Sequence, residues 1–167
     1  MTEAASATAS GGSHLRPVPD VSTEKLTIAQ AVRDALGDEM VAAVPASAID
    51  GKIGGHPDRM EQEWAAQGET KGAWLRLTWP KARTIDRVWL FDRPTHLDRI
   101  MAAELRFSDG APIAVGPLPD SAAQGREIAF PPRTVTWLEV RVTKTKSDHP
   151  YVGISEIAVF AAKAERN

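Results

Sequence analysis

The sequence predicts an all-β protein built as an antiparallel sandwich or barrel, and three observations support this prediction. From about residue 46 onward, apolar and polar residues alternate in many short segments, which is the period of a strand with one buried face. Turn-forming Pro, Gly and Asp separate these segments. Strand patterns do not alternate with helix patterns, which argues against a parallel α/β enzyme fold.

The first 45 residues have a different character. Residues 1–20 are rich in Ala, Ser, Thr, Gly and Pro and have little to bury, so we interpret them as a disordered leader or linker. Within residues 21–45, a helical spacing of apolar residues favours a short amphipathic helix over 22–36. A strand over 25–32 is the alternative, because apolar and polar residues also alternate there. The helix-spaced residues are Leu26, Ala29, Val32 and Leu36.

Six to eight short strands are expected in the remainder of the chain. Asp109-Gly110 lies between two alternating segments and predicts a β-hairpin, because glycine accepts the positive φ of a tight turn. Strand breaks are expected at clusters of Pro, Gly and Asp. The inward-facing residues of the clearest strands are Leu75, Leu77, Trp79, Val88, Leu90, Ala103, Leu105, Phe107, Ile113, Val115, Ile128, Phe130, Leu138, Val140, Val142, Ile154, Ile157 and Val159. The expected breaks are Trp79-Pro80, Asp92-Arg93-Pro94, Gly116-Pro117-Leu118-Pro119 and Pro131-Pro132.

Composition excludes several classes of function. The chain has 20 basic and 22 acidic residues, a balance that argues against a nucleic-acid surface. It has no cysteine, and therefore no disulfide and no cysteine nucleophile or metal ligand. No apolar run approaches the roughly 20 residues that span a bilayer, and the N-terminus lacks the pattern of a signal peptide. The compartment stays open, because such a chain suits the cytoplasm or a part of a larger exported protein.

The sequence contains no recognisable catalytic motif. It lacks a nucleophile elbow, a zinc-protease motif, a phosphate-binding loop and a dinucleotide fingerprint. The four histidines are far apart in sequence. They could converge on a metal site of a metal-dependent enzyme, but a scattered placement on the surface is favoured. We therefore expect no enzyme. The histidines are His14, His56, His96 and His149.

Two polar segments are candidates for ligand binding. In residues 61–69, three carboxylates including Glu69 surround Trp64, and an aromatic face beside hydrogen-bond acceptors suits a sugar. The alternative is that Trp64 fills the core. In residues 91–100, two arginines, two aspartates and a histidine suit a polyhydroxylated ligand, or they form an internal Asp–Arg network that fixes the loop. These side chains are Asp92, Arg93, His96, Asp98 and Arg99.

A third candidate pairs Asp50, which precedes Gly51, with Glu156. Calcium prefers carboxylate and carbonyl oxygens, and a glycine lets the backbone turn around the ion. The alternative is a turn aspartate and a strand-edge glutamate.

Six motifs over about residues 46–160 resemble the discoidin, or coagulation-factor type C, superfamily, in the order seen there. The similarity is greatest to its bacterial and fungal branch of carbohydrate-binding modules. The motifs are Ala48-Ile49-Asp50-Gly51, Glu63-Trp64, Gly72-Ala73-Trp74-Leu75-Arg76-Leu77, Ile85-Asp86-Arg87-Val88-Trp89-Leu90-Phe91-Asp92-Arg93, Ser108-Asp109-Gly110 and Val152-Gly153-Ile154-Ser155-Glu156-Ile157-Ala158-Val159-Phe160.

The resemblance implies a galactose-binding-like jelly roll over residues 46–162, followed by a tail at 163–167. It implies a non-catalytic module that binds glycans at loops on one end, often attached to a carbohydrate-active enzyme. It also implies a structural calcium held by Asp50 and Glu156, and a ligand contact at Arg93. The sequence departs from the family in the acidic run at 61–63 and in having no clear opening strand before Ala46.

We therefore predict a glycan-binding module, with a protein-interaction or assembly module of the same fold as the alternative. The predicted ligand-binding residues are Trp64, Glu69, Asp92, Arg93, His96, Asp98 and Arg99.

Overall fold

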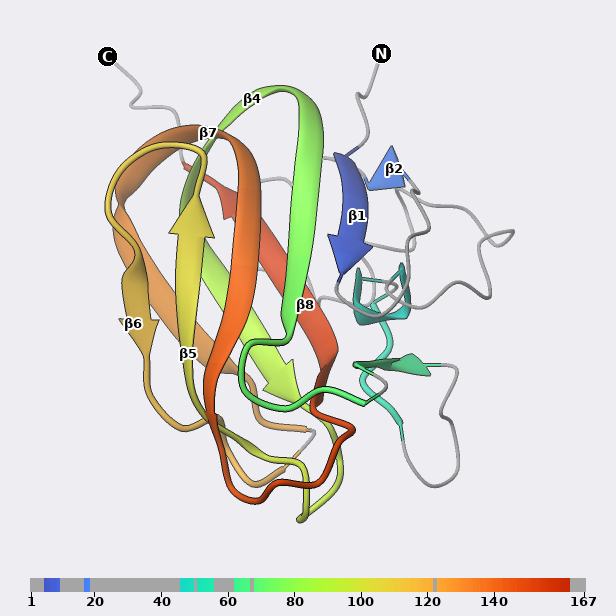
Figure 1. The fold of residues 1–167 in the computed structure, drawn as a ribbon. Helices are drawn as coiled ribbons and strands as arrows, with labels where there is room; N and C mark the ends of the chain where they lie inside the picture. Colours follow the sequence, from blue (N-terminus) through green and yellow to red (C-terminus); the bar gives the residue numbers. More distant parts are fainter. Residues whose placement is uncertain are drawn as a thin grey trace.

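A computed structural model describes residues 5–9, 17–18, 46–49, 51–55, 62–66, 68–121 and 123–162. Over these ranges the chain forms eight strands and one 3-10 turn, and every ladder between named strands is antiparallel (Figure 1). The predicted antiparallel sandwich of the jelly-roll type is thereby confirmed. The elements are β1 (Ala5–Ala9), β2 (Pro17–Val18), η1 (Ala46–Ile49), β3 (Trp64–Ala65), β4 (Trp74–Asp92), β5 (Ile100–Phe107), β6 (Ile113–Val115), β7 (Arg126–Thr145) and β8 (Gly153–Ala161).

Two long strands, β4 and β7, pass from one layer of the sandwich to the other. Figure 1 shows both arching over the same end of the molecule. The first part of β4, Trp74–Thr78, pairs with β1 and with the second part of β7. Its second part pairs with the first part of β7 and with β8. One layer therefore has the order β2-β1-β4-β7-β5-β6, and the other is built from β7, β4, β8 and β3.

The prolines at Pro80 and Pro131-Pro132 do not end strands, and this part of the prediction is wrong. Both sites lie inside continuous strands, where the β4–β7 register shifts between Thr78 and Arg83 and again between Ile85 and Arg87. A proline cannot donate to the ladder, but Pro80 and Pro131-Pro132 lie in the segments 79–82 and 130–132, which the β4–β7 register skips. The prolines therefore mark where the strands bend between layers.

The predicted alternation is confirmed in the core. Leu75, Leu77, Leu138 and Val140 are buried on facing strands, together with most of the other predicted inward-facing residues. The predicted hairpin is confirmed as well: β5 and β6 pair, and Gly110 has a φ of 82° in the connection.

Strand β8 is buried on both faces. Its side chains contribute to the sandwich core, and η1 and residues 51–55 also lie against it. Ser155 fixes this segment, because its Oγ accepts from Gly54 N at 3.1 Å and donates to Gly54 O at 2.6 Å. At the start of β8, a Cβ on Gly153 would lie 1.9 Å from the carbonyl oxygen of Trp64. Only glycine permits β3 to approach β8 this closely.

Strands β1 and β2 lie inside the segment that we predicted to be a disordered leader, so that prediction does not hold for residues 5–9 and 17–18. Strand β1 pairs with β4 from Ser6↔Thr78 to Ala9↔Leu75. Ala, Ser and Thr give no apolar alternation, but their backbone extends the sheet between β4 and β2. The predicted helix at 22–36, its strand alternative and the tail at 163–167 lie outside the described residues. Across the described ranges, none of the helical structure is long and apolar enough to cross a membrane.

Candidate functional site

Four loop segments meet at the end of the sandwich opposite the arches of β4 and β7 (Figure 1). Residues 66–73 and 146–152 are joined by Ala66 N to Val152 O at 2.8 Å and by Gly68 N to Pro150 O at 2.9 Å. Residues 93–99 and 146–152 are joined by Ser147 Oγ, which donates to Leu97 O at 2.7 Å. Residues 116–121 are joined to the end of segment 93–99 by Leu118. Its N donates to Ile100 O at 3.0 Å, and its O accepts from Arg99 Nη2 at 2.6 Å. We call these four segments together the loop end.

The side chain of Arg93 links several segments at the loop end. Its Nη2 donates to Glu63 Oε1 at 2.5 Å, its Nη1 donates to Asp98 Oδ2 at 3.1 Å, and the same Nη1 donates to the carbonyl oxygen of Tyr151. Arg93 is only 7% exposed, and Glu63 and Asp98 are buried with it. A buried cation needs such partners because desolvation of an unpaired charge is costly. Arg93 therefore ties three segments that are distant in sequence.

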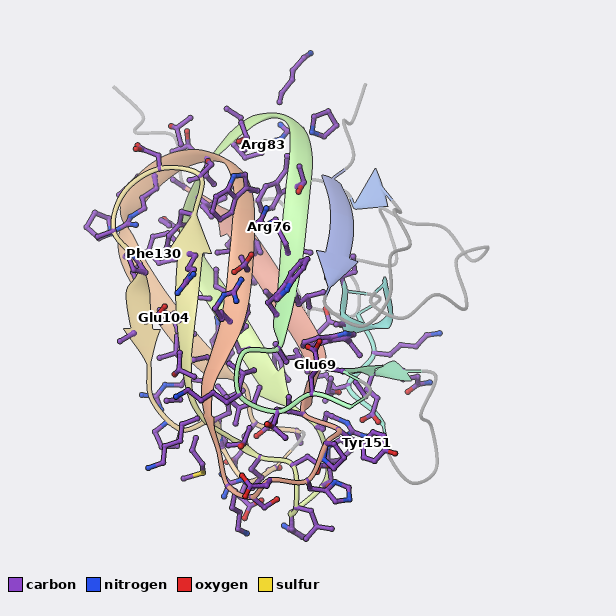
Figure 2. All side chains as sticks on the ribbon, in the orientation of Figure 1. Glu69, Arg76, Arg83, Glu104, Phe130 and Tyr151 are labelled. Atoms are coloured by element: carbon purple, nitrogen blue, oxygen red, sulfur yellow. The ribbon has the colours of Figure 1, made fainter. Side chains whose placement is uncertain are left out.

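This buried network ends at an exposed aromatic pair. Asp98 Oδ1 contacts Nδ1 of His149, whose side chain is 43% exposed. The ring of His149 lies 5.2 Å from that of Tyr151, tilted by 56°, and Tyr151 is 45% exposed. Tyr151 also forms an isolated bridge with Glu69, and Figure 2 shows these two residues near each other at the loop end. We call the two rings the His149–Tyr151 pair.

The side chain of Asp92 stabilises the turn after β4 through hydrogen bonds to the backbone. Its Oδ1 accepts from Arg93 N and its Oδ2 accepts from Ile100 N, both at 3.0 Å. Burial raises the pKa of Asp92 from 3.8 to about 7, although these backbone amides and the nearby Arg99 and Arg93 favour the charged form. Both carboxylate oxygens of Asp92 are thus used inside the protein.

A second, more exposed cluster lies beside this turn. Asp120 Oδ1 contacts His96 Nδ1 at 3.1 Å and Arg99 Nε at 3.2 Å. Arg99 also donates from Nη2 to Leu118 O at 2.6 Å. His96 is exposed, whereas the side chain of Arg99 is largely covered. Within the predicted segment 91–100, the structure places Asp92, Arg93 and Asp98 in an internal network and leaves His96 open to solvent.

Trp64 is 1% exposed and belongs to the core. It begins β3 and pairs with Ile154 of β8. Its ring therefore offers no stacking face to a ligand, and the core alternative holds. Glu69, the other predicted residue of this segment, is partly exposed at the loop end.

The sequence prediction missed the two side chains that are exposed on top of the network. His149 was considered only as one of four scattered histidines, and Tyr151, the only tyrosine of the chain, was not considered. The available signal was the segment Asp148-His149-Pro150-Tyr151, which places two rings in a loop directly before the last strand.

The predicted calcium ligands are only partly described. Glu156 is completely buried, and its Oε2 accepts from Gly51 N at 3.1 Å, where Gly51 has a φ of 76°. Asp50 lies outside the described residues. A buried carboxylate beside a glycine turn fits a hard cation. In the part of the chain that the structure describes, no three His, Asp or Glu side chains gather as a metal site would require.

Solved structures of low sequence identity share this fold. CpGH89CBM32-5 from Clostridium perfringens, solved in complex with GalNAc-β-1,3-galactose, superposes with a TM-score of 0.61 at 16% identity, covering 94% of this chain and 95% of that one. The fucolectin from the serum of striped bass, Morone saxatilis, superposes with a TM-score of 0.60 at 16% identity, covering 96% of this chain and 46% of that one.

A third match lies within a much longer protein. The arabinofuranosyltransferase AftD from Mycobacteria superposes with a TM-score of 0.63 at 17% identity, covering 97% of this chain but only 11% of AftD. These likenesses show a galactose-binding-like jelly roll.

Comparison with curated proteins finds no match. The family model of a domain of unknown function, DUF7402, matches residues 28–160, which is most of the chain. The chain therefore belongs to the DUF7402 family.

Proposed function

We propose that this protein is a non-catalytic glycan-binding module, with the His149–Tyr151 pair as the centre of its contact surface. The observation that carries the proposal is an exposed aromatic pair held from below by the buried Glu63–Arg93–Asp98 network.

The chemistry of the loop end suits a sugar. A pyranose ring presents C–H groups, which pack on an aromatic face such as that of Tyr151, and hydroxyls, which exchange hydrogen bonds with polar side chains. His149, His96, Asp120 and Glu69 supply such groups at the loop end. A binding surface fixed by a buried network loses little conformational entropy when a ligand arrives.

Similar structures support the proposal. Relatives of this fold were solved with GalNAc-β-1,3-galactose and with galactose, but at 16% and 15% identity. The match within AftD supports the further proposal that such a module accompanies a carbohydrate-active enzyme. A fold alone does not determine a ligand.

One observation favours protein interaction as the second candidate function. On the outer face of β4 and β7, the guanidinium of Arg76 lies 4.4 Å from the ring centre of Trp137 and 5.7 Å from that of Trp74. Both tryptophans are partly exposed, and Trp and Arg are enriched in protein interfaces. A protein partner that is lost with Trp137→Ala, but retained with Tyr151→Ala, would favour this candidate.

A glycan array followed by calorimetry tests the proposed function. Single-site binding in the range of about 10 µM to 1 mM is expected, which corresponds to about 4 to 7 kcal/mol. Tyr151→Ala should weaken binding at least about tenfold, because it removes the stacking ring. Ile53→Ala is the control, since Ile53 is also an exposed apolar residue but lies on the segment against β8. If the wild type binds no glycan at millimolar concentration, the proposal fails.

A further inference from the structure

Four charged or titratable side chains form a continuous line from the core to the surface at the loop end. In order they are Glu63, Arg93, Asp98 and His149. They come from the residue directly before β3, the turn after β4, and the loop before β8. Their exposure increases along the line, because the first three are buried and the imidazole of His149 is nearly half exposed.

Arg93 is not available as a ligand contact. Its two terminal nitrogens are occupied by Glu63, Asp98 and the carbonyl of Tyr151. Its Nε is buried as well and has no partner among the described residues. A ligand would have to displace one of these buried contacts to reach the guanidinium, and each displaced group would lose its partner inside the protein.

The same contacts hold both members of the aromatic pair. Arg93 binds the backbone of Tyr151 directly, and it binds Asp98, which in turn contacts the ring of His149. A shift of the Arg93 guanidinium would therefore move the Tyr151 backbone and the His149 ring together.

Asp98 also determines which nitrogen of His149 carries the proton. A carboxylate can only accept, so the ring nitrogen that it contacts, Nδ1, must be the donor. In a neutral imidazole, the other nitrogen, Nε2, is then left as an acceptor. The opposite tautomer would place a lone pair against the carboxylate.

We propose that Arg93 is a positioning residue rather than a ligand contact, and that it acts through Asp98 to fix His149 in the Nδ1–H tautomer. Where the glycan-binding proposal holds, on which this part rests, Nε2 of His149 accepts a hydrogen bond from a sugar hydroxyl.

Long-range proton–nitrogen NMR of the full, nitrogen-15-labelled chain tests this inference without a ligand. The spectra are recorded over a pH series, and the tautomer is read where the ring-nitrogen shifts of His149 themselves report the neutral form. The signals of His149 are assigned with His149→Gln. We expect the Nδ1–H tautomer in the wild type, and a mixture of tautomers in Asp98→Asn. The matched control is Asp148→Asn, because Asp148 is an exposed neighbour of His149 in sequence, and it should leave the tautomer unchanged. An Nε2–H tautomer in the wild type overturns the inference.

Arg93→Lys separates positioning from contact. Lysine keeps the charge but lacks the fork that reaches Glu63, Asp98 and Tyr151 together. If Arg93 acts through Asp98, Arg93→Lys should lower the Nδ1–H fraction of His149 in the free protein. Unchanged tautomers in a folded Arg93→Lys variant would overturn the positioning role.

Galactose and GalNAc-β-1,3-galactose serve as probes for the ligand part. We expect about tenfold weaker binding for Asp98→Asn, the loss of about one hydrogen bond, and unchanged binding for Asp148→Asn. Weaker binding by Arg93→Lys with a wild-type tautomer would show direct contact and overturn the positioning role. Absence of binding to every glycan, with the Nδ1–H tautomer present, would refute the proposed function while the tautomer assignment stands.

Discussion

Arg93 and Asp98 form an ion pair, Nη1 to Oδ2 at 3.1 Å, in which both side chains are almost entirely covered. The pair lies directly after β4 and beneath the exposed rings of the loop end. A buried pair of this kind contributes less net stability than its Coulomb attraction suggests, because both ions lose their hydration. It does, however, make the loop end sensitive to the removal of either partner.

Removal of the buried guanidinium should be far more costly than removal of a surface one. Arg93→Met leaves two buried carboxylates without their cation, and we expect a loss of about 3–5 kcal/mol in the free energy of unfolding. The control is Arg106→Met, because Arg106 pairs with Glu104 on an open strand face where both side chains are substantially exposed, and it should cost less than about 1 kcal/mol. Urea denaturation measures both. Equal losses in the two variants would show that the Arg93 network is not buried as described.

Truncation of Trp64 should destabilise the protein much more than truncation of Tyr151. Trp64→Ala empties a fully buried site and should destabilise the protein by about 3–5 kcal/mol. Tyr151→Ala removes a half-exposed ring and should change stability by less than about 1 kcal/mol. Thermal unfolding of the two variants checks this. A small effect of Trp64→Ala would restore the hypothesis that Trp64 is a ligand platform.

The fold was predictable from sequence to the extent that it depends on local apolar alternation. The alternation of apolar and polar residues predicted these strands because each has one buried face, as at Leu75, Leu77, Leu138 and Val140. The continuity of β4 and β7 was not predictable in this way. Pro80 and Pro131 signal a break, and only the pairing of the two strands shows that both prolines lie at register shifts. Strand β1 carried no apolar signal, because backbone pairing with β4 holds it.

The sequence pointed to the polar segment 91–100 as a candidate site, but it did not show which of its side chains are buried. The segment 91–100 was identified from its polar side chains, yet the sequence did not reveal that Arg93 is buried. That burial depends on Glu63, thirty residues earlier in the chain, and on the backbone of Tyr151, far later. The rings of His149 and Tyr151 are held by contacts with Asp98 and Arg93. These contacts form only in the tertiary structure, so the sequence could not indicate them.

Stability should fall with increasing pH because of Asp92. The folded pKa of about 7 lies above the ordinary value of 3.8, so the folded state holds this proton more tightly than the unfolded state. The stabilising contribution is complete below about pH 4 and is lost as the pH rises to about 7, with a magnitude of up to about 4 kcal/mol.

Asp92→Asn isolates this effect, since asparagine stays neutral at every pH. Urea denaturation of both proteins between about pH 4 and pH 8 gives the difference in their unfolding free energies, which cancels the titration of all other groups. We expect the wild type to lose stability relative to Asp92→Asn across this range. A constant difference would show that Asp92 titrates normally.

Calcium should stabilise the protein if Asp50 and Glu156 hold the calcium ion that the resemblance to the discoidin superfamily implies. A ligand that binds only the folded state adds about 2.7 kcal/mol at about 100 times its dissociation constant. We therefore expect added calcium to raise the melting temperature by several degrees, a chelator to lower it, and Glu156→Gln to abolish the response. A melting temperature that changes with neither calcium nor chelator would argue against the site. A calcium response that persists in Glu156→Gln would place the ion elsewhere.

The glycan-binding role of the His149–Tyr151 pair is tested most directly by calorimetric titration of wild type, Tyr151→Ala and Ile53→Ala with the strongest glycan from an array. We predict measurable binding by the wild type, at least about tenfold weaker binding by Tyr151→Ala, and wild-type binding by Ile53→Ala. Equal affinities of the wild type and Tyr151→Ala would contradict the proposed site, and a wild type that binds no glycan at all would contradict the proposed function.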